Sequence, residues 1–259
     1  MKLDAVQKAA QEQFSRQSGQ YGQGHILQDV SDVQAAVEQI PLQEGSRVLD
    51  VATGGGHTGL YLASLGHQVI LADIAAPMLE KAVALGRLRG VTAEARLHAA
   101  EELPYASGTF DLVTCRVAAH HFSSPSSFVQ EAARVLASDG YLLVIDGSVP
   151  DGQPEAEEWL HQVEKLRDPS HGRFLSPKKW GELCNASGLT VIKSELTPFK
   201  QPDLEWYFTA ADTSPANREA VRKLVADAPD SAREAFKLGL EETRVVWWWP
   251  RLTLIARKG

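Results

Sequence analysis

Two carboxylates and a run of glycines are the residues of this chain whose types and spacing indicate chemistry. Asp50 ends one apolar run, and Asp73 ends the next; residues 54–56 between them are consecutive glycines. A glycine loop that joins a strand to a helix, with an acid ending the following strand, is how an α/β sheet holds a cofactor that carries a nucleoside. Because one carboxylate can accept both hydroxyls of a ribose, we expect Asp73 to bind an unphosphorylated ribose. The alternative for Asp73 is an N-cap of the helix that starts near Ala76.

The same residues also fit a dinucleotide-binding motif, which makes a nicotinamide-dependent oxidoreductase one hypothesis. Gly54, Gly56 and Gly59 satisfy G-x-G-x-x-G, and Asp73 stands about where that motif requires an acid. Against this hypothesis, Asp50 directly before the loop suits a cofactor with a free ammonium group and is unfavourable beside a pyrophosphate. A histidine and a threonine also follow the glycines, where a pyrophosphate loop usually has small residues.

Short motifs follow one another at residues 48–56, 72–79, 100–105, 108–116, 120–122, 134–136 and 139–146. In their order and spacing they resemble those of the class I S-adenosylmethionine-dependent methyltransferases, in the branch of the ubiquinone/menaquinone methyltransferases and their small-molecule relatives. Residues 166–171 also resemble a subgroup of uncharacterised bacterial methyltransferases. The resemblance implies S-adenosylmethionine as methyl donor, S-adenosylhomocysteine as product, and transfer to oxygen or to an activated aromatic carbon of a small molecule. A protein that binds S-adenosylmethionine without catalysis is a further alternative.

The elements that must position these residues alternate between strands and helices. This alternation predicts an α/β fold with a doubly wound parallel sheet. The resemblance implies a Rossmann-like sheet of seven strands in the order 3-2-1-4-5-7-6, with the last strand antiparallel. We expect these strands at residues 47–51, 68–73, 93–98, 110–116, 140–146, 189–198 and 243–257.

We expect one domain over residues 1–259, with a helical cap. Apolar residues at helical spacing predict a helix over 26–40, after a first helix over 4–18. Ser176 followed by Pro177 indicates the start of another helix, and residues 203–242 are expected to be helical in at least two pieces. The parts are N-terminal helices that form a lid (1–40), a cofactor-binding core (41–149), two cap insertions (150–176 and 203–242) and the remainder of the core (177–202 and 243–259).

The resemblance also implies which residues bind the methionine part and the adenine. The backbone from Ala52 through Gly54 to Gly56 is expected to meet the methionine part. Asp50 is expected near its ammonium group, or bonded to the amides of the loop, and these two roles are compatible. Ile74 and Met78 are expected near the adenine, with plain core packing as the alternative for Met78.

One departure from the family pattern affects the adenine contact. Many relatives carry an acid at the position of Ala99, which bonds the exocyclic amine; here we expect Glu101 or the backbone of Ala100 to replace it. Tyr21, with glycines around it, is expected to close over the methionine part, and packing between helix and sheet is its alternative. Arg116 is expected to approach the carboxylate of the cofactor.

Methyl transfer from a sulfonium requires alignment and the exclusion of water, and a base only where the acceptor must lose a proton. His120 and His121 follow the fourth expected strand, and a neutral imidazole suits this role. Since adjacent side chains usually point apart, we expect His120 to face the substrate and His121 to make a structural bond. Arg167 and His171, in the first cap insertion, are expected to bind the substrate, with an ion pair between Arg167 and Asp168 as the alternative.

Three consecutive tryptophans, residues 247–249, lie in the last expected strand. Alternation sends Trp247 and Trp249 to one face and Trp248 to the other. We expect them to pack in the core or against the cap, and a flat wall for an aromatic substrate is the alternative. Residues 206–208 are expected to line the cap.

Composition excludes several classes of protein. The net charge is −7 and the Lys and Arg residues form no long cluster, which argues against a nucleic-acid substrate. No apolar run reaches the ~18 residues of a membrane span, and residues 1–12 are too polar for a secretory signal. Two cysteines make no disulfide framework, and no carboxylate cluster indicates a metal. We therefore expect a cytoplasmic enzyme with a small-molecule substrate; the sequence allows a homodimer.

Overall fold

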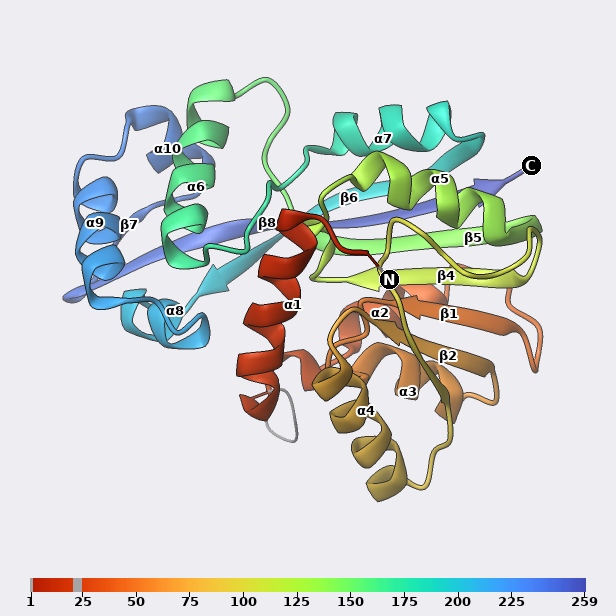
Figure 1. Ribbon diagram of the computed structural model, residues 1–259. Helices are drawn as coiled ribbons and strands as arrows, with labels where there is room; N and C mark the ends of the chain where they lie inside the picture. The colour runs from red at the N-terminus through yellow and green to blue at the C-terminus, as the bar shows by residue number, and fades with distance from the viewer. Residues whose placement is uncertain (1, 21–24) are drawn as a thin grey trace.

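A mixed sheet of eight strands lies at the centre of the structure, a computed structural model that describes residues 2–20 and 25–259 (Figure 1). The strand order is β3-β2-β1-β4-β5-β8-β6, and the short β7 pairs only with β8. This confirms the predicted order, with β8 in the place of the seventh expected strand and β7 as an addition. The strands are β1 (Arg47–Val51), β2 (Gln68–Asp73), β3 (Glu94–Leu97), β4 (Phe110–Arg116), β5 (Leu136–Gly147), β6 (Leu189–Gln201), β7 (Gly239–Glu241) and β8 (Arg244–Lys258).

Strand direction places the chemical residues at one edge of the sheet. The first five strands pair in parallel, and β8 is antiparallel to both β5 and β6, as predicted. Strands β1, β2 and β4 are largely buried because helices cover both faces. Their carboxyl ends, which carry Asp50, Asp73 and Arg116, therefore meet at the same edge.

Helices pack on both faces of the sheet and form two apolar clusters. On one face Val33, Leu60 and Leu79 pack against the strands, and on the other face Phe128 and Trp180 do so. The first group of helices is α2 (Ser31–Val37), α3 (His57–Ser64) and α4 (Ala76–Arg89); the second is α5 (Pro125–Val135) and α7 (Pro177–Ala186).

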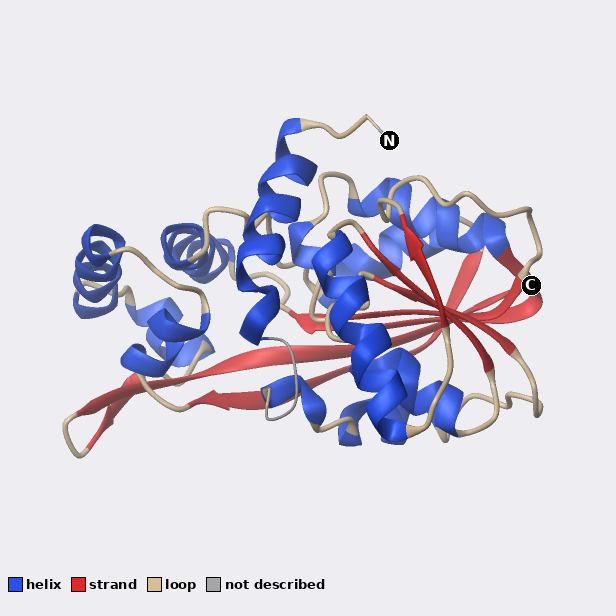
Figure 2. Ribbon diagram, turned by 60° about the horizontal axis from the view of Figure 1, so that its bottom comes forward, coloured by secondary structure: helices blue, strands red, loops and turns tan. Residues whose placement is uncertain are grey.

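A third apolar cluster holds a helical cap together. Trp159, Phe208, Phe236 and Trp247 are buried within it. Strands β6 and β8 run beyond the other strands as a paired ribbon, and the cap helices pack along this extension (Figure 2). The cap helices are α6 (Pro154–Arg167), α8 (Leu204–Ala210), α9 (Pro215–Ala226) and α10 (Asp230–Ala235).

The helix α1 (Ala5–Gln17) stands between the carboxyl edge of the sheet and the cap (Figure 1). Asp4 and Gln7 cap its first turn reciprocally. From its middle, Gln13 Nε2 donates a hydrogen bond to the carbonyl oxygen of Ala211 at the end of α8, over 3.3 Å. Helix α1 thus covers the space between the two parts.

Two predicted helices were wrong in extent. The helix expected over 26–40 divides into a 3-10 turn, Ile26–Gln28, and α2, because Asp29 is extended and its side chain accepts the amide of Ser31. The helical stretch expected over 203–242 ends as strand β7, which the chain forms by turning back onto β8 at Glu242, where φ is 56°. The start of α7 is as predicted, since Ser176 Oγ accepts the amide of Lys179. No helix among the described residues is long and apolar enough to cross a membrane.

Candidate functional site

Asp50 lies beneath the glycine loop and holds it in place. Its carboxylate accepts hydrogen bonds from Thr53 Oγ1 at 2.5 Å, Thr114 Oγ1 at 2.7 Å and the amide of Gly59 at 2.9 Å. Burial raises the pKa of Asp50, and these three bonds oppose the rise. The carboxylate thus bonds groups of the protein around the loop, which is the second of the two roles expected for Asp50.

Two glycines of the motif are required by packing. Gly56 has a φ of 83°, and a Cβ there would lie 2.7 Å from Cβ of Ala82. Gly59 lies in α3, where a Cβ would lie 2.2 Å from Cδ2 of Leu71. These glycines let α3 lie close to β2 and α4, so the match to G-x-G-x-x-G does not by itself indicate a pyrophosphate.

Asp73 reaches from the end of β2 to the glycine loop. Its Oδ2 accepts the amide of Gly54 and its Oδ1 the amide of Ala75, both at 2.9 Å. Ala75, not Asp73, is the N-cap of α4, so the alternative role is wrong. Burial raises the pKa of Asp73 to about 6, against the effect of these amides.

A cavity of about 860 Å³, including the space at its mouth, opens along this edge, and we call it the first cavity. Asp50 and Gly56 do not line it, because Asp50 lies beneath the loop and Gly56 faces Ala82 of α4. Tyr21 lies outside the described residues. Eight other residues expected to bind the cofactor line this cavity: Ala52, Gly54, Asp73, Ile74, Met78, Ala100, Glu101 and Arg116.

The wall expected to face the adenine contains a histidine that sequence reasoning missed. His98 lines the first cavity, with Nδ1 2.9 Å from the carbonyl oxygen of Ala99 and Nε2 2.8 Å from Oη of Tyr105. Glu101 accepts the amide and hydroxyl of Ser123, and its other oxygen accepts Nε2 of Gln7 from α1. Glu101 therefore anchors α1 over the cavity.

Arg116 joins the sheet edge to the first turn of α2 and to the segment before it. Its guanidinium bonds Asp32, at 2.8 Å from Nη2, and donates to the carbonyl oxygens of Leu27 and Asp29. Most of its donors are thus used within the protein, although the side chain lines the first cavity.

A second cavity of about 900 Å³ lies between the sheet edge, α1 and the cap. It adjoins the first cavity, because Phe14, Leu27, Val117 and His121 line both. Val117 has a φ of 52°, an unfavourable conformation for a β-branched residue. Such strain is concentrated at functional sites in proteins, and here it lies where the two cavities meet.

His120 lines the second cavity and is bonded to a buried carboxylate that sequence reasoning did not assign to the site. Asp146, at the end of β5, accepts Nδ1 of His120 at 2.7 Å and its backbone amide at 2.9 Å. Burial disfavours the charged imidazole, but the charge and hydrogen bond of Asp146 outweigh it, so the pKa of His120 is raised. Since the carboxylate requires a proton on Nδ1, Nε2 is the free acceptor in the neutral ring. No residue in the described part of the chain bonds Nε2.

His121 lines both cavities, so both histidines reach a cavity wall, and His121 also makes a bond of the kind expected for it. Both belong to a 3-10 turn, Ala119–His121, and their ring centroids are 4.2 Å apart. Nδ1 of His121 lies 3.1 Å from the carbonyl oxygen and the hydroxyl of Ser170, whose hydroxyl donates to Asp168. Burial, with the neighbouring His120, lowers the pKa of His121 to about 4.

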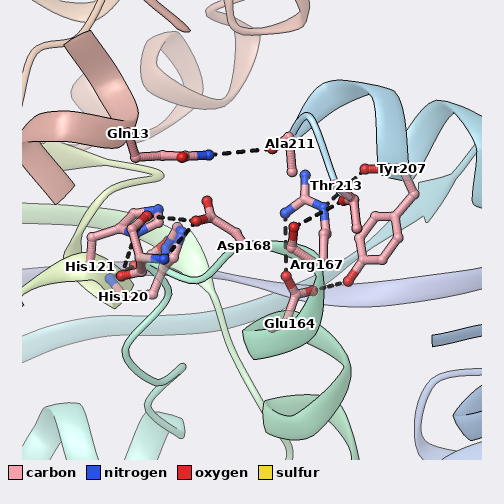
Figure 3. A network of polar contacts seen from close by, with 11 residues as sticks. Gln13, His120, His121, Glu164, Arg167, Asp168, Tyr207, Ala211 and Thr213 are labelled. Carbon is pink, nitrogen blue, oxygen red and sulfur yellow. Dashed lines mark hydrogen bonds and ion pairs between the residues drawn. The ribbon is translucent and has the colours of Figure 1, made fainter. Parts of the chain in front are cut away.

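Of the two residues expected to bind the substrate, Arg167 lines a cavity and His171 does not. Arg167 lines the second cavity and pairs with Glu164 at 3.3 Å, not with Asp168 (Figure 3). Glu164 also accepts the hydroxyl of Tyr207 at 2.5 Å. His171 is 2% exposed and packs behind His120 without lining either cavity, so its assignment to the substrate is not supported.

The aromatic residues of the cap divide between core and cavity. Trp247 is buried in the cap core, whereas Trp249 and Trp206 line the second cavity. Asp146 could have been found from the sequence by the same rule as Asp73, since both end a parallel strand. Arg251, which also lines this cavity, has no comparable local signal.

The chain is similar in sequence and in structure to known methyltransferases. Residues 49–144 match a family model described as a methyltransferase domain. The uncharacterized methyltransferase YcgJ of Bacillus subtilis is 30% identical over 88% of this chain and 90% of its own. A demethylmenaquinone methyltransferase of Clavibacter sepedonicus is 31% identical, over 87% and 92% respectively. The crystal structure of a candidate methyltransferase from Bacillus halodurans has a TM-score of 0.83 and 30% identity, and covers 88% of this chain and 99% of its own.

Proposed function

Since this chain belongs to the class I S-adenosylmethionine-dependent methyltransferases, we propose that it methylates a hydroxyl oxygen of a small molecule bound in the second cavity. The observation that carries this proposal is the hydrogen-bonded pair of His120 and Asp146 in a cavity that adjoins the first. A base of this kind is needed for a hydroxyl acceptor, whose proton must leave as the new bond forms.

The residues of the first cavity fit S-adenosylmethionine. We assign Asp73 to the ribose hydroxyls, because its carboxylate lines the cavity beside the loop amides. Ile74 and Met78 supply apolar surface for the adenine, and Ala100 and His98 lie where its edge is expected.

When bound, S-adenosylmethionine supplies a methyl carbon on a sulfonium, so that transfer joins this carbon to the acceptor oxygen, breaks its bond to sulfur and leaves S-adenosylhomocysteine. His120 Nε2 accepts the hydroxyl proton. Asp146 fixes the orientation of the ring and stabilises the imidazolium that results, which makes it a positioning residue. His121, in the wall common to both cavities, fixes the position of the acceptor, and α1 with the cap excludes water from it.

The test is transfer of labelled methyl from S-adenosylmethionine to a panel of phenols and enols. His120→Gln is expected to lower kcat by ~10²- to 10⁴-fold, the contribution of a general base, with the affinity for S-adenosylhomocysteine unchanged. The matched control is His67→Gln, which should leave kcat unchanged. His67 directly precedes β2, at the end of the strand away from Asp73 and the cavities. Full activity of His120→Gln would remove it as the base, and a product methylated at carbon would contradict transfer to oxygen.

A further inference from the structure

Two side chains in the wall of the second cavity, Arg251 and Gln17, carry hydrogen-bond donors that no described residue satisfies. We propose that its acceptor is a hydroxylated aromatic acid whose carboxylate is bound by Arg251. This inference rests on the proposed function of the second cavity and adds the chemical class of its substrate.

The guanidinium of Arg251 is largely buried and has no close carboxylate partner, a geometry suited to binding an anion. Its side chain is 16% exposed, and the nearest carboxylate oxygen, on Asp32, lies 3.5 Å from Nη1. The guanidinium stacks over the ring of Phe199, 3.9 Å from its centroid. Within the described residues it donates no hydrogen bond that meets ordinary geometry, although a guanidinium carries five donors.

The carboxylates of Asp32, Asp146 and Asp29 lie near Arg251, and each of them also bonds another group. Asp32 is shared, because its carboxylate already pairs with Arg116 at 2.8 Å. The other acids near the cavity are engaged, since Asp146 accepts His120 and Asp168 accepts Ser170. A largely buried charge without a full partner is costly. A ligand carboxylate on Arg251 would supply the hydrogen-bonded partner that it lacks, through a bidentate pair.

The walls beside Arg251 favour a flat ring. Trp249 lies two residues before it on β8, hence on the same face, and is paired with Phe199 of β6. Trp206 of α8 also lines the cavity. Aromatic walls of this kind stack or make edge contacts with planar rings. Gln17 of α1 lines the same cavity, and its buried Nε2 has no partner in the described part of the chain, which leaves a further donor for an acidic ligand.

Strand register relates the anion site to the base. Arg251 of β8 is the partner of Gly147 on β5, directly after Asp146, which holds His120. The carboxylate on Arg251 and the hydroxyl at His120 are therefore expected on one compact aromatic framework, such as a hydroxybenzoate or a hydroxycinnamate, and not at the ends of a long chain.

The test measures binding by calorimetry to the protein saturated with S-adenosylhomocysteine. The probes are the ortho, meta and para hydroxybenzoates and hydroxycinnamates, each with its neutral amide. At least one acid is expected to bind 10-fold or more tightly than its amide. Arg251→Gln should abolish this preference and leave the affinity for S-adenosylhomocysteine unchanged, and Arg251→Lys should restore part of it, because lysine keeps the charge but not the bidentate geometry. The matched control is Arg257→Gln, an exposed position on the same strand.

The outcomes separate this inference from the proposed function. Absence of any preference for an acid, or a preference that survives Arg251→Gln, would overturn the inference. An acid that binds through Arg251 but receives no labelled methyl group would support the anion site and contradict the proposed methylation. Methyl transfer to neutral phenols alone would support the proposed function and overturn the acid as its substrate.

Discussion

Substitution of Asp146 by Asn is the most informative perturbation of the proposed base. Both oxygens of this carboxylate are used: Oδ2 accepts the amide of His120, and Oδ1 accepts both Nδ1 of His120 and the amide of Gly147. An asparagine offers only one oxygen, so its NH₂ group must face a donor on one side. In either orientation the charge that stabilises the protonated ring of His120 is lost.

The magnitude follows from these two orientations. If the amide oxygen faces Nδ1 of His120, a charge-assisted hydrogen bond of about 1.5–3 kcal/mol becomes a neutral one of about 0.5–1.5 kcal/mol. The difference of about 1–1.5 kcal/mol lowers kcat by ~5- to 13-fold. If the NH₂ group faces Nδ1 instead, the proton moves to Nε2 and the base is lost, a decrease of up to ~10⁴-fold.

The assay is the dependence of kcat on pH, measured with labelled methyl donor and the acceptor identified in the panel. Because Asp146 raises the pKa of His120 above its usual 6.5, the acid limb of the profile should move to lower pH in Asp146→Asn, while the plateau falls. The control is Asp139→Asn, on the exposed part of the same strand. A plateau that falls without movement of the limb would indicate a merely structural role, and an unchanged profile would refute the reasoning.

Thermal unfolding checks the same pair independently. A raised pKa in the folded state means that His120 contributes stability fully below its unfolded pKa of about 6.5, and that this contribution is lost as pH rises through the folded value. The stability difference between the wild type and Asp146→Asn should therefore be largest in acid and should shrink at alkaline pH. The opposite trend would contradict the ion pair.

Three further predictions concern binding and stability. Asp73→Ala should weaken the binding of S-adenosylhomocysteine by about 3 kcal/mol, or ~150-fold. In the wild type, the affinity measured by calorimetry should fall as pH drops below about 6, where Asp73 takes up a proton. Constant affinity from pH 8 to pH 5 would contradict the ribose assignment. Gly59→Ala should lower the free energy of unfolding in urea by about 1–3 kcal/mol, because its Cβ would meet Leu71; wild-type stability would show that α3 can shift. Tyr207→Phe should lower the free energy of unfolding by about 1–3 kcal/mol, because it removes the hydrogen bond to the buried Glu164. An unchanged melting temperature would mean that this bond makes no net contribution to stability.

The carboxyl edge of the sheet could be predicted from the sequence because its signals are local. Asp50 and Asp73 each end an apolar run, and parallel strands bring such ends together whatever follows in the chain. The sequence left two roles open for Asp50, near the ammonium group or bonded to the loop. Only the structure shows its bonds within the protein, because one partner, the hydroxyl of Thr114, lies 64 residues away.

The second cavity could not be predicted in the same way. Its residues come from α1, the turn after β4, the cap and β8, and their proximity depends on long-range pairing, as between Gly147 and Arg251. Strand β7 likewise has three residues and exists only through its pairing with β8. The division of the helix expected over 26–40 depends on the side chain of Asp29, which competes locally with the helical pattern.

The central claim is that the first cavity is built for S-adenosylmethionine and not for a dinucleotide. Parallel calorimetric titrations with S-adenosylhomocysteine and with NAD test it most directly. We predict micromolar binding of S-adenosylhomocysteine and no binding of NAD. Binding of NAD alone would contradict the account and would restore the dinucleotide interpretation of the glycine motif, and binding of neither would show that the wall around Ala99 and His98 does not accept an adenine.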